Sequence, residues 1–326
     1  MRVHGIGIGL GGIGGVGRLQ QLKLALARFV ELGFDLVEID PSPFSLIFNG
    51  ELRRPQLEDY IAVLRNFDLR YSMHGLMRLN LAYDPRHELC KKIMLCQIEI
   101  ARQMGAQALV YHSGLQALDD VRHGVRQSLL TDEELAEGAR REVEAFKSLA
   151  PAAADAGVVI GMENGDPHQW EYNVLTKTNR PPVEIVKHHP RLRLGPIVRQ
   201  LEAIDHPNVG ITLDVGHLYI AAKALGFDVL AEVETAAPWV RHIHAHDNFG
   251  LLDRGFGAEP DRWPYGEADV HTLPGWGTIP LRGIFARLPE YDGDVVLELK
   301  SGFWDYFGEG LLAMRGVLEE IEPQSH

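Results

Sequence analysis

Short β-branched runs alternate with amphipathic helical stretches from one end of the chain to the other. This alternation constrains the fold more than any other feature, because strands that alternate with helices form parallel sheets. The expected strands are Val3–Gly9, Phe34–Asp40, Leu69–His74, Ala108–His112, Val158–Glu163, Val209–Asp214, Val240–His246 and Asp294–Lys300. The expected helices are Leu19–Leu32, Leu57–Asn66, Pro85–Met104, Thr131–Ala156, Ile197–Ile204, His217–Leu225, Leu281–Leu288 and Leu311–Ile321. Eight such units predict an α/β protein with a closed (β/α)8 barrel, or TIM barrel.

The chain length fits one such barrel with enlarged loops. A barrel of this type needs ~250 residues, and the chain has 326. No break in composition marks a second domain, so we expect a single TIM-barrel domain over residues 1–326. Two connections are too long for plain loops, namely Asn164–Leu194 after the fifth strand and Asp247–Thr278 after the seventh. Both follow strands and should therefore rise over the carboxyl-terminal mouth of the barrel.

The composition of the chain argues against nucleic-acid and membrane partners. The formal net charge of −13 argues against a nucleic-acid partner, because proteins that grip a phosphate backbone normally present a basic surface. No apolar run is long enough to span a bilayer, and the start MRVHGIGIG is typical of a strand rather than a signal peptide. Cys90 and Cys96 lie six positions apart in a helical segment and would not share a face. We interpret them as reduced core thiols of a cytoplasmic protein.

The glycine-rich start resembles a dinucleotide-binding fingerprint. Gly7, Gly9 and Gly12 match GxGxxG after a strand, and Asp40 ends the next strand. The step from Gly12 to Asp40 is longer than the usual ~20 residues, however, and the run contains surplus glycines. The pattern therefore favours a flexible first loop of a barrel over a nucleotide-binding fold.

Side chains that bind metals gather at the expected strand ends. The third, fourth, fifth and sixth strands end at His74, His112, Glu163 and Asp214, and Glu298 lies near the end of the eighth. The seventh strand carries His242, His244 and His246 at alternate positions, which period-two geometry directs to one face. Asp214 and His217 are three positions apart, and Asp269 and His271 two apart, so each pair could meet at one ion.

Each of these residues alone has an ordinary explanation, such as Asp214 capping the following helix. That explanation weakens when six strand ends present ligand-type side chains to the same mouth. Carboxylates with imidazoles suit zinc, manganese or iron(II), and thiolates are absent from the set. The ordinary interpretation is kept for His188, His189 and His206, which lie away from strand ends, and for His242, which should lie deeper in the barrel. His246 stays open as a substrate contact.

The order of these motifs resembles the xylose isomerase-like, endonuclease IV-like TIM-barrel superfamily over nearly the whole chain. The motifs that carry the resemblance are His74-Gly-Leu-Met-Arg-Leu-Asn-Leu, Tyr111-His112-Ser-Gly, Met162-Glu163-Asn164, Leu213-Asp214-Val-Gly-His217, His244-Ala-His-Asp247-Asn248, Asp269-Val-His271-x3-Gly275-x-Gly277 and Leu297-Glu298-Leu-Lys300. That superfamily includes sugar-phosphate isomerases and epimerases as well as endonucleases that cut DNA at abasic sites.

The resemblance implies two alternative metal centres. In the isomerase and epimerase group, one ion is held by residues matching Glu163, Asp214, His244 and Glu298. The two glutamates there act as acid and base, and His217 contacts the substrate. In the endonuclease group, a three-metal cluster adds residues matching His74, His112, His217, Asp269 and His271, and this chain has all nine. The resemblance therefore implies a divalent metal cofactor of one to three ions.

Other residues separate the two alternatives. Met77 stands where the endonucleases insert a tyrosine into DNA, and the first long insertion carries Trp170. These departures and the acidic charge favour a small sugar or sugar phosphate, with His217, His246, Trp170 and Lys300 as substrate-binding residues. A multinuclear phosphoesterase is the alternative, and a non-catalytic metal-dependent binding module is a third possibility. Nucleic acid and membrane partners are not expected, and a homo-oligomer is possible.

Overall fold

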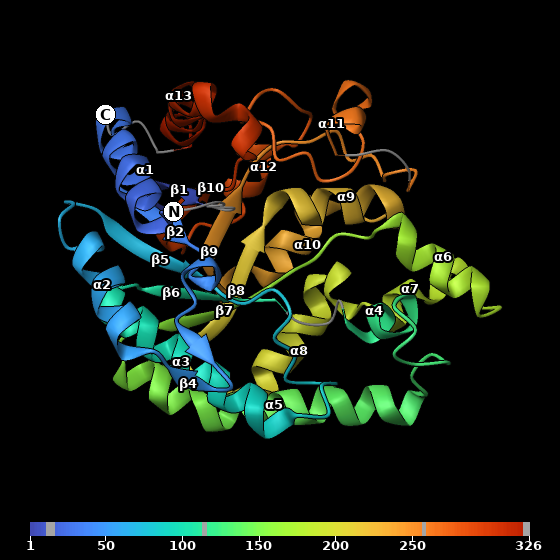
Figure 1. The fold of residues 1–326 in the computed structure, drawn as a ribbon. Helices are drawn as coiled ribbons and strands as arrows, with labels where there is room; N and C mark the ends of the chain where they lie inside the picture. Colours follow the sequence, from blue (N-terminus) through green and yellow to red (C-terminus); the bar gives the residue numbers. More distant parts are fainter. Residues whose placement is uncertain (11–16, 113–115, 256–258, 322–326) are drawn as a thin grey trace.

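The computed structural model describes residues 1–10, 17–112, 116–255 and 259–321. Eight parallel strands close into a barrel in the order β1-β10-β9-β8-β7-β6-β5-β2, and helices surround it (Figure 1). The barrel strands are β1 (Arg2–Leu10), β2 (Leu36–Ile39), β5 (Arg70–His74), β6 (Ala108–Tyr111), β7 (Val159–Glu163), β8 (Val209–Asp214), β9 (Val240–Ala245) and β10 (Asp292–Leu297). The predicted (β/α)8 fold is confirmed. The closed barrel also excludes the open sheet of a dinucleotide-binding fold; Gly12 of the glycine motif lies outside the described residues.

The outer helices follow the strands nearly as predicted. They are α1 (Arg18–Leu32), α2 (Arg54–Leu64), α3 (His87–Met104), α5 (Asp132–Asp155), α8 (Leu194–Ile204), α9 (Val215–Leu225), α12 (Leu281–Phe285) and α13 (Phe307–Glu319). Helix α5 begins at a capping box, in which the Thr131 hydroxyl accepts from the Glu134 amide and the Glu134 carboxylate accepts from the Thr131 amide. Helix α10 (Val229–Ala236) and a small hairpin of β3 (Ile47–Phe48) and β4 (Glu51–Leu52) were not predicted from the sequence.

The enlarged loops form a wall beside the barrel mouth. Helix α4 (Gln116–Arg122) follows β6, α6 (Gln169–Lys177) and α7 (Ile185–His188) follow β7, and α11 (Glu259–Arg262) follows β9. Figure 1 shows α4, α6 and α7 grouped on one side of the molecule. A separate apolar cluster holds this group against α9, made of Leu118, Val174, Leu175, Ile185, Leu192 and Ala221. The insertion after β7 is therefore a packed element and not a loose loop.

Several strand ends differ from the expectation, and among them β6 ends at Tyr111, so the candidate ligand His112 lies directly beyond its strand. The last barrel strand ends at Leu297 and not at Lys300, so Glu298 lies directly beyond it, although its amide still donates to the Ala245 carbonyl. Strand β9 ends at Ala245, so His246 also lies past its strand. Cys90 is buried and Cys96 is partly buried, and both are free thiols as predicted. Among the described residues, no helix combines the length and the apolar character that a membrane span requires.

Candidate metal centre

Four side chains from adjacent strand ends converge at the carboxyl-terminal mouth and form what we call the first cluster: Glu163, Asp214, His244 and Glu298. Each offers one ligand atom, and these four atoms all lie within 4.8 Å of one another. His244 lies at the centre, with its Nδ1 2.7 Å from Glu163 Oε1, 3.4 Å from Glu298 Oε2 and 3.9 Å from Asp214 Oδ2. Parallel strands end at one rim of the barrel, and this brings together residues that are far apart in the sequence.

Two further predicted histidines flank this cluster. His112 Nε2 lies 2.8 Å from Glu163 Oε2, and His74 Nε2 lies 3.5 Å from Glu298 Oε1. Their rings are 4.3 Å apart, yet their pKa values shift in opposite directions. Burial lowers the pKa of His112 because the attraction of Glu163 does not offset it. For His74, burial also opposes the charged form, but Glu298 raises the pKa to about 9.

His217, His246, Asp269 and His271 form a second cluster next to the first. His217 Nε2 lies 3.1 Å from Asp269 Oδ2, the imidazole of His271 contacts the same oxygen, and His246 stacks on His271 with ring centroids 3.9 Å apart. His246 Nε2 also lies 3.2 Å from Asp214 Oδ1, so Asp214 lies between the two clusters. All nine residues predicted as ligands therefore lie in one connected group, together with His246.

The residues present fit divalent cations. Burial raises the pKa of Glu163, but His112 and His244 hold it well below its usual range, so the carboxylate is ionised. The imidazoles around Asp269, with His271 first, lower its pKa in the same way against the effect of burial. Asp214 Oδ2 and Asp269 Oδ1 are buried without a hydrogen-bond partner among the described residues. Buried carboxylate oxygens that lack hydrogen bonds and face imidazoles are the donor set that zinc, manganese and iron(II) use in proteins.

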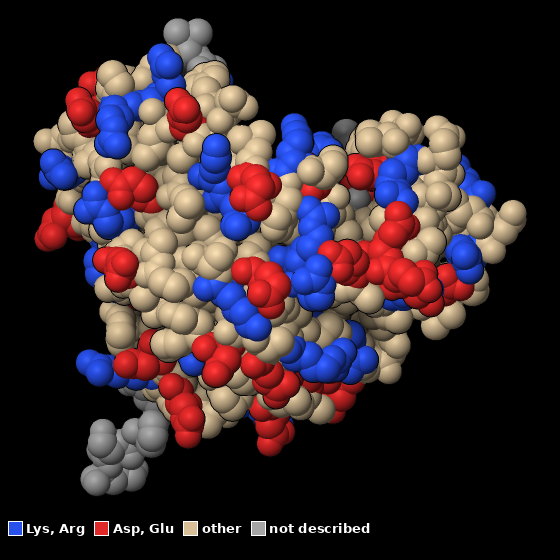
Figure 2. All heavy atoms as spheres, turned by 90° about the horizontal axis from the view of Figure 1, so that it is seen from below, with Lys and Arg blue, Asp and Glu red and all other residues tan. Residues whose placement is uncertain are grey.

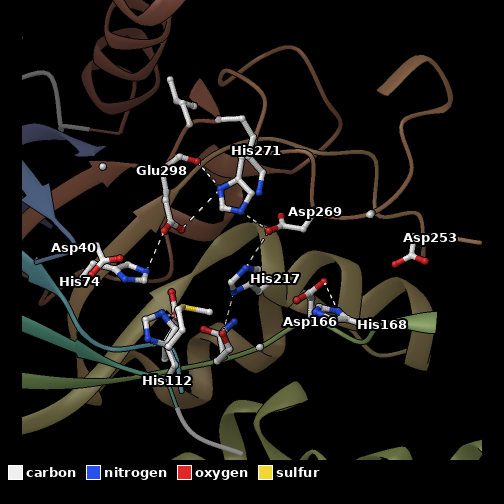
Figure 3. A pocket seen from close by; sticks show the side chains of 18 of the residues that line it. Asp40, His74, His112, Asp166, His168, His217, Asp253, Asp269, His271 and Glu298 are labelled. Carbon is white, nitrogen blue, oxygen red and sulfur yellow. Dashed lines mark hydrogen bonds and ion pairs between the residues drawn. The ribbon is translucent and has the colours of Figure 1, made fainter. Parts of the chain in front are cut away.

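A cavity of about 820 Å³ opens above these residues. Figure 3 shows Glu298 joined to His74 by an ion pair, and it shows His217 and Asp269 between this pair and Asp166 and His168 of the insertion after β7. Of the residues predicted to bind substrate, His217, Trp170 and Lys300 line the cavity. His246 is completely buried and is not part of the lining, so the structure places it among the candidate ligands.

The insertion after β7 contributes polar groups that the sequence analysis missed. Asp166 is buried, and its Oδ2 lies 3.3 Å from His168 Nδ1; both residues line the cavity (Figure 3). Trp170 lies beside His168, and the Arg122 guanidinium stacks over the indole at 4.6 Å. His189, interpreted as an ordinary loop residue, is buried with Nδ1 3.0 Å from Glu171 Oε1 and also borders the cavity. The spacing of Asp166 and His168 two residues apart, directly after a strand end, was the available signal.

Glu38 is the other residue that the sequence analysis missed. It lies within β2, only 1% exposed, in contact with both histidines of β9. Its Oε2 accepts from Ser72 Oγ at 2.9 Å and lies 2.8 Å from His242 Nε2, so His242 has a deep structural position as predicted. The signal for Glu38 was a charged residue between apolar neighbours in a short strand.

A closed parallel barrel with carboxylates and imidazoles converging at its carboxyl-terminal mouth defines a (β/α)8 protein with a candidate cation-binding centre. The sequence comparison makes the assignment specific: the chain belongs to the xylose isomerase-like TIM barrel family, whose model matches residues 26–315. This result confirms the resemblance seen in the strand-end motifs.

Solved structures and a curated relative are similar to this chain over different lengths. A D-tagatose 3-epimerase-like protein is 18% identical with a TM-score of 0.66, covering 97% of this chain and 98% of the other. D-psicose 3-epimerase from Clostridium cellulolyticum H10, solved with D-tagatose, is 15% identical with a TM-score of 0.64, covering 98% and 100%. The uncharacterized protein MJ1311 of Methanocaldococcus jannaschii is 29% identical over 158 residues, which span 48% of this chain and only 42% of the relative. At these identities the structural likeness shows the fold.

Proposed function

We propose that the protein is a divalent-metal-dependent isomerase or epimerase of a small sugar or sugar phosphate. The observation that carries this proposal is the pair Glu163 and Glu298, which each place a carboxylate oxygen within 4.8 Å of the other at the cavity floor. The similarity in fold to a D-tagatose 3-epimerase-like protein and to D-psicose 3-epimerase supports the same class of reaction.

The two glutamates have different surroundings, as acid and base groups require. The Glu163 side chain is only 4% exposed and contacts His112 and His244, whereas the Glu298 side chain is 21% exposed to the cavity. One glutamate, as the ionised carboxylate, would take the carbon-bound proton of a sugar held between them, and the other, in its protonated form, would deliver a proton to the opposite face of the same carbon. A divalent ion on the first cluster would supply electrostatic stabilisation of the negative charge that develops on the substrate oxygens.

The rest of the cavity suits a polyhydroxylated ligand. His217, Asp166 and His168 present polar atoms along one side, and Trp170 offers an apolar ring at the wall. Sugars combine hydroxyl groups with apolar C–H faces, and pockets that bind small molecules use the same combination of apolar walls and a few polar groups. The charged Lys300, which also lines the cavity, would favour a phosphorylated or otherwise anionic sugar.

Hydrogen exchange tests the proposal. Metal-loaded protein is incubated with a panel of ketohexoses, pentuloses and their phosphates in deuterated water, and deuterium at the epimerised carbon is measured by NMR. We expect Glu163→Gln and Glu298→Gln each to lower the exchange rate by about 10²–10⁴-fold, because each removes a proton carrier. Glu137→Gln, on the exposed face of α5, is the control. Exchange at the unaltered rate in both active-site variants would defeat the proposal.

The second cluster favours a second candidate, a multinuclear phosphoesterase. Two or three ions can activate a water and clamp the attacking and leaving oxygens of a phosphoester, and the ten connected side chains (His74, His112, Glu163, Asp214, His217, His244, His246, Asp269, His271 and Glu298) could bind more than one ion. Element-resolved metal content separates the candidates. One ion per chain supports proton transfer at the first cluster, and three ions with phosphodiester cleavage would support hydrolysis.

A further inference from the structure

The buried network beneath the first cluster links three barrel strands through Glu38. Its carboxylate, on β2, accepts a hydrogen bond from Ser72 Oγ on β5 and pairs with His242 Nε2 on β9 through the same oxygen, Oε2. The other oxygen, Oε1, lies 2.8 Å from His244 Nε2. Contacts from β5 and β9 therefore hold the carboxylate of β2 next to His244.

His244 lies between two sets of carboxylates. Its Nδ1 makes a 2.7 Å hydrogen bond to the Glu163 carboxylate, and a cation bound at the first cluster would replace the proton of that bond; its Nε2 faces Glu38. Glu38 Oε1 and His244 Nε2 are both buried, and neither makes an aligned hydrogen bond in the described structure. A small rotation of the ring would align the Nε2–H with Oε1 and satisfy both atoms, whereas the opposite tautomer would leave two buried acceptors facing each other.

We infer that Glu38 is a positioning residue of the metal centre, which keeps the proton of His244 on Nε2 and thereby leaves the Nδ1 lone pair free to bind the cation of the first cluster. The arrangement is a carboxylate–histidine–metal relay, in which an outer acid fixes the tautomer and the orientation of the ligand and increases its basicity. Ser72 and His242 hold the acid in turn. The inference rests on the proposed metal centre but not on the reaction that the centre performs.

The energetics support a functional reason for this carboxylate. Burial of a charged group in a barrel interior is unfavourable unless hydrogen bonds and opposite charges compensate for it. For Glu38 this compensation comes from the Ser72 hydroxyl at 2.9 Å and from the ring nitrogens of His242 and His244, each 2.8 Å from one carboxylate oxygen. An apolar residue would fill this position at a lower free-energy cost, so the charge is best explained by its action on His244.

The test measures metal affinity and proton position rather than turnover. Metal-stripped full-length protein is titrated with Co²⁺, and the dissociation constant, the number of ions and the visible spectrum are recorded. We expect Glu38→Gln to weaken Co²⁺ binding by roughly 10–100-fold and to alter the spectrum. Ser72→Ala, which removes only one hydrogen bond to the acid, should weaken binding by roughly 2–10-fold. In Zn²⁺-loaded protein, nitrogen-15 NMR should show the proton of His244 on Nε2.

Glu171→Gln is the matched control, because Glu171 and His189 form an equally buried acid–imidazole pair 3.0 Å apart outside both clusters. Glu171→Gln should lower the thermal unfolding midpoint of the metal-free protein about as much as Glu38→Gln does. It should nevertheless leave the affinity for Co²⁺ unchanged. Unchanged affinity in Glu38→Gln, or a proton on Nδ1, would overturn the inference. Loss of one bound ion with unaltered affinity for the rest would also overturn it and make Glu38 a ligand. Failure of the unaltered protein to bind Co²⁺ would contradict the metal-dependent function as well.

Discussion

The two carboxylate oxygens of Asp214 have different roles. Oδ1 accepts from the His217 amide at 2.7 Å and caps helix α9, while Oδ2 is directed at His244 in the first cluster. The ordinary explanation of this residue as a helix cap and its interpretation as a metal ligand are therefore both consistent with the structure. Because the cap fixes the side-chain rotamer, the second oxygen is held in place before any cation binds.

The Asp166–His168 pair predicts a pH dependence that can be measured at one residue. Burial lowers the pKa of His168, but Asp166 raises it to about 9 from the ordinary value of 6.5. Since the folded pKa is raised, the stabilisation by this pair is complete below about pH 6.5 and is lost as pH rises towards 9. The effect is small, because a third of the His168 side chain is exposed and solvent screens the charges.

Side-chain NMR of metal-free protein measures the titration of His168 directly. In Asp166→Asn, the pKa should return towards 6.5, and the fall in thermal unfolding midpoint between pH 6.5 and 9 should be smaller than in the unaltered protein. A His168 that titrates at the same pH with and without the Asp166 carboxylate would contradict this account of the pair.

The position of a site residue on its strand decided whether it could be predicted from the sequence. His74, Glu163 and Asp214 end strands, and the ends of parallel strands share one rim, so spacing alone indicated that they meet. Glu38 lies inside a strand, where the one-dimensional pattern does not distinguish a residue under the rim from any inward residue. Asp166 and His168 depend on how the insertion packs, which is a tertiary property.

At the scale of elements, the wall of the cavity has its own apolar cluster, and this predicts local rather than global instability. Leu175 on α6 is completely buried in that cluster. Leu175→Ala should lower the free energy of opening of α6 and α7 by about 2–5 kcal/mol, because it leaves a cavity among packed side chains. Hydrogen–deuterium exchange should then accelerate in α6 and α7 while peptides of the barrel strands keep their protection.

Leu201→Ala, on α8 against the barrel, is the comparison for that experiment, since Leu201 belongs to the main core. It should reduce protection throughout the barrel. Uniformly faster exchange in both variants would show that the wall and the barrel unfold as one unit.

Strong periodicity made the long elements predictable and left the short ones unresolved. Helix α5 was expected at Thr131–Ala156 and spans Asp132–Asp155, because its capping box and amphipathic pattern both mark it. Helix α10 has only eight residues, and the β3–β4 hairpin has two residues a strand, too few for a periodic signal. The expected helix Leu281–Leu288 ends at Phe285, where the chain turns towards Pro289 and the last strand.

For the whole molecule, removal of metal should abolish activity while the fold persists. The barrel buries one large apolar cluster that extends from Ile6 to Met314 and does not depend on the mouth. Chelated protein should therefore keep its far-ultraviolet circular dichroism signal and lose all turnover. Collapse of the helical signal on chelation would instead assign the ions a structural role.

The charge of the whole molecule predicts that DNA is not the natural substrate. The chain has 32 basic and 45 acidic residues, and Figure 2 shows basic and acidic side chains interspersed over the face that it presents. Met77, half-exposed at the cavity, offers no aromatic ring for stacking. Metal-loaded protein should thus fail to nick duplex DNA with an abasic site, even at low salt, where backbone binding is strongest. Efficient nicking that disappears in His112→Ala and Asp269→Ala would contradict this prediction and support the phosphoesterase function.

The barrel closes where its first and last strands pair, and Glu298 follows directly on that seam: β10 runs beside β1, with Leu297 opposite Ile8. The first cluster therefore lacks Glu298 until β10 has been synthesised and has paired with β1. A nascent chain that has reached β9 already carries Glu163, Asp214 and His244, but it has no complete cage. The nascent chain would therefore bind the cation with full affinity only after the barrel has closed. Ribosome-stalled chains that end before Asp292 should bind the metal weakly.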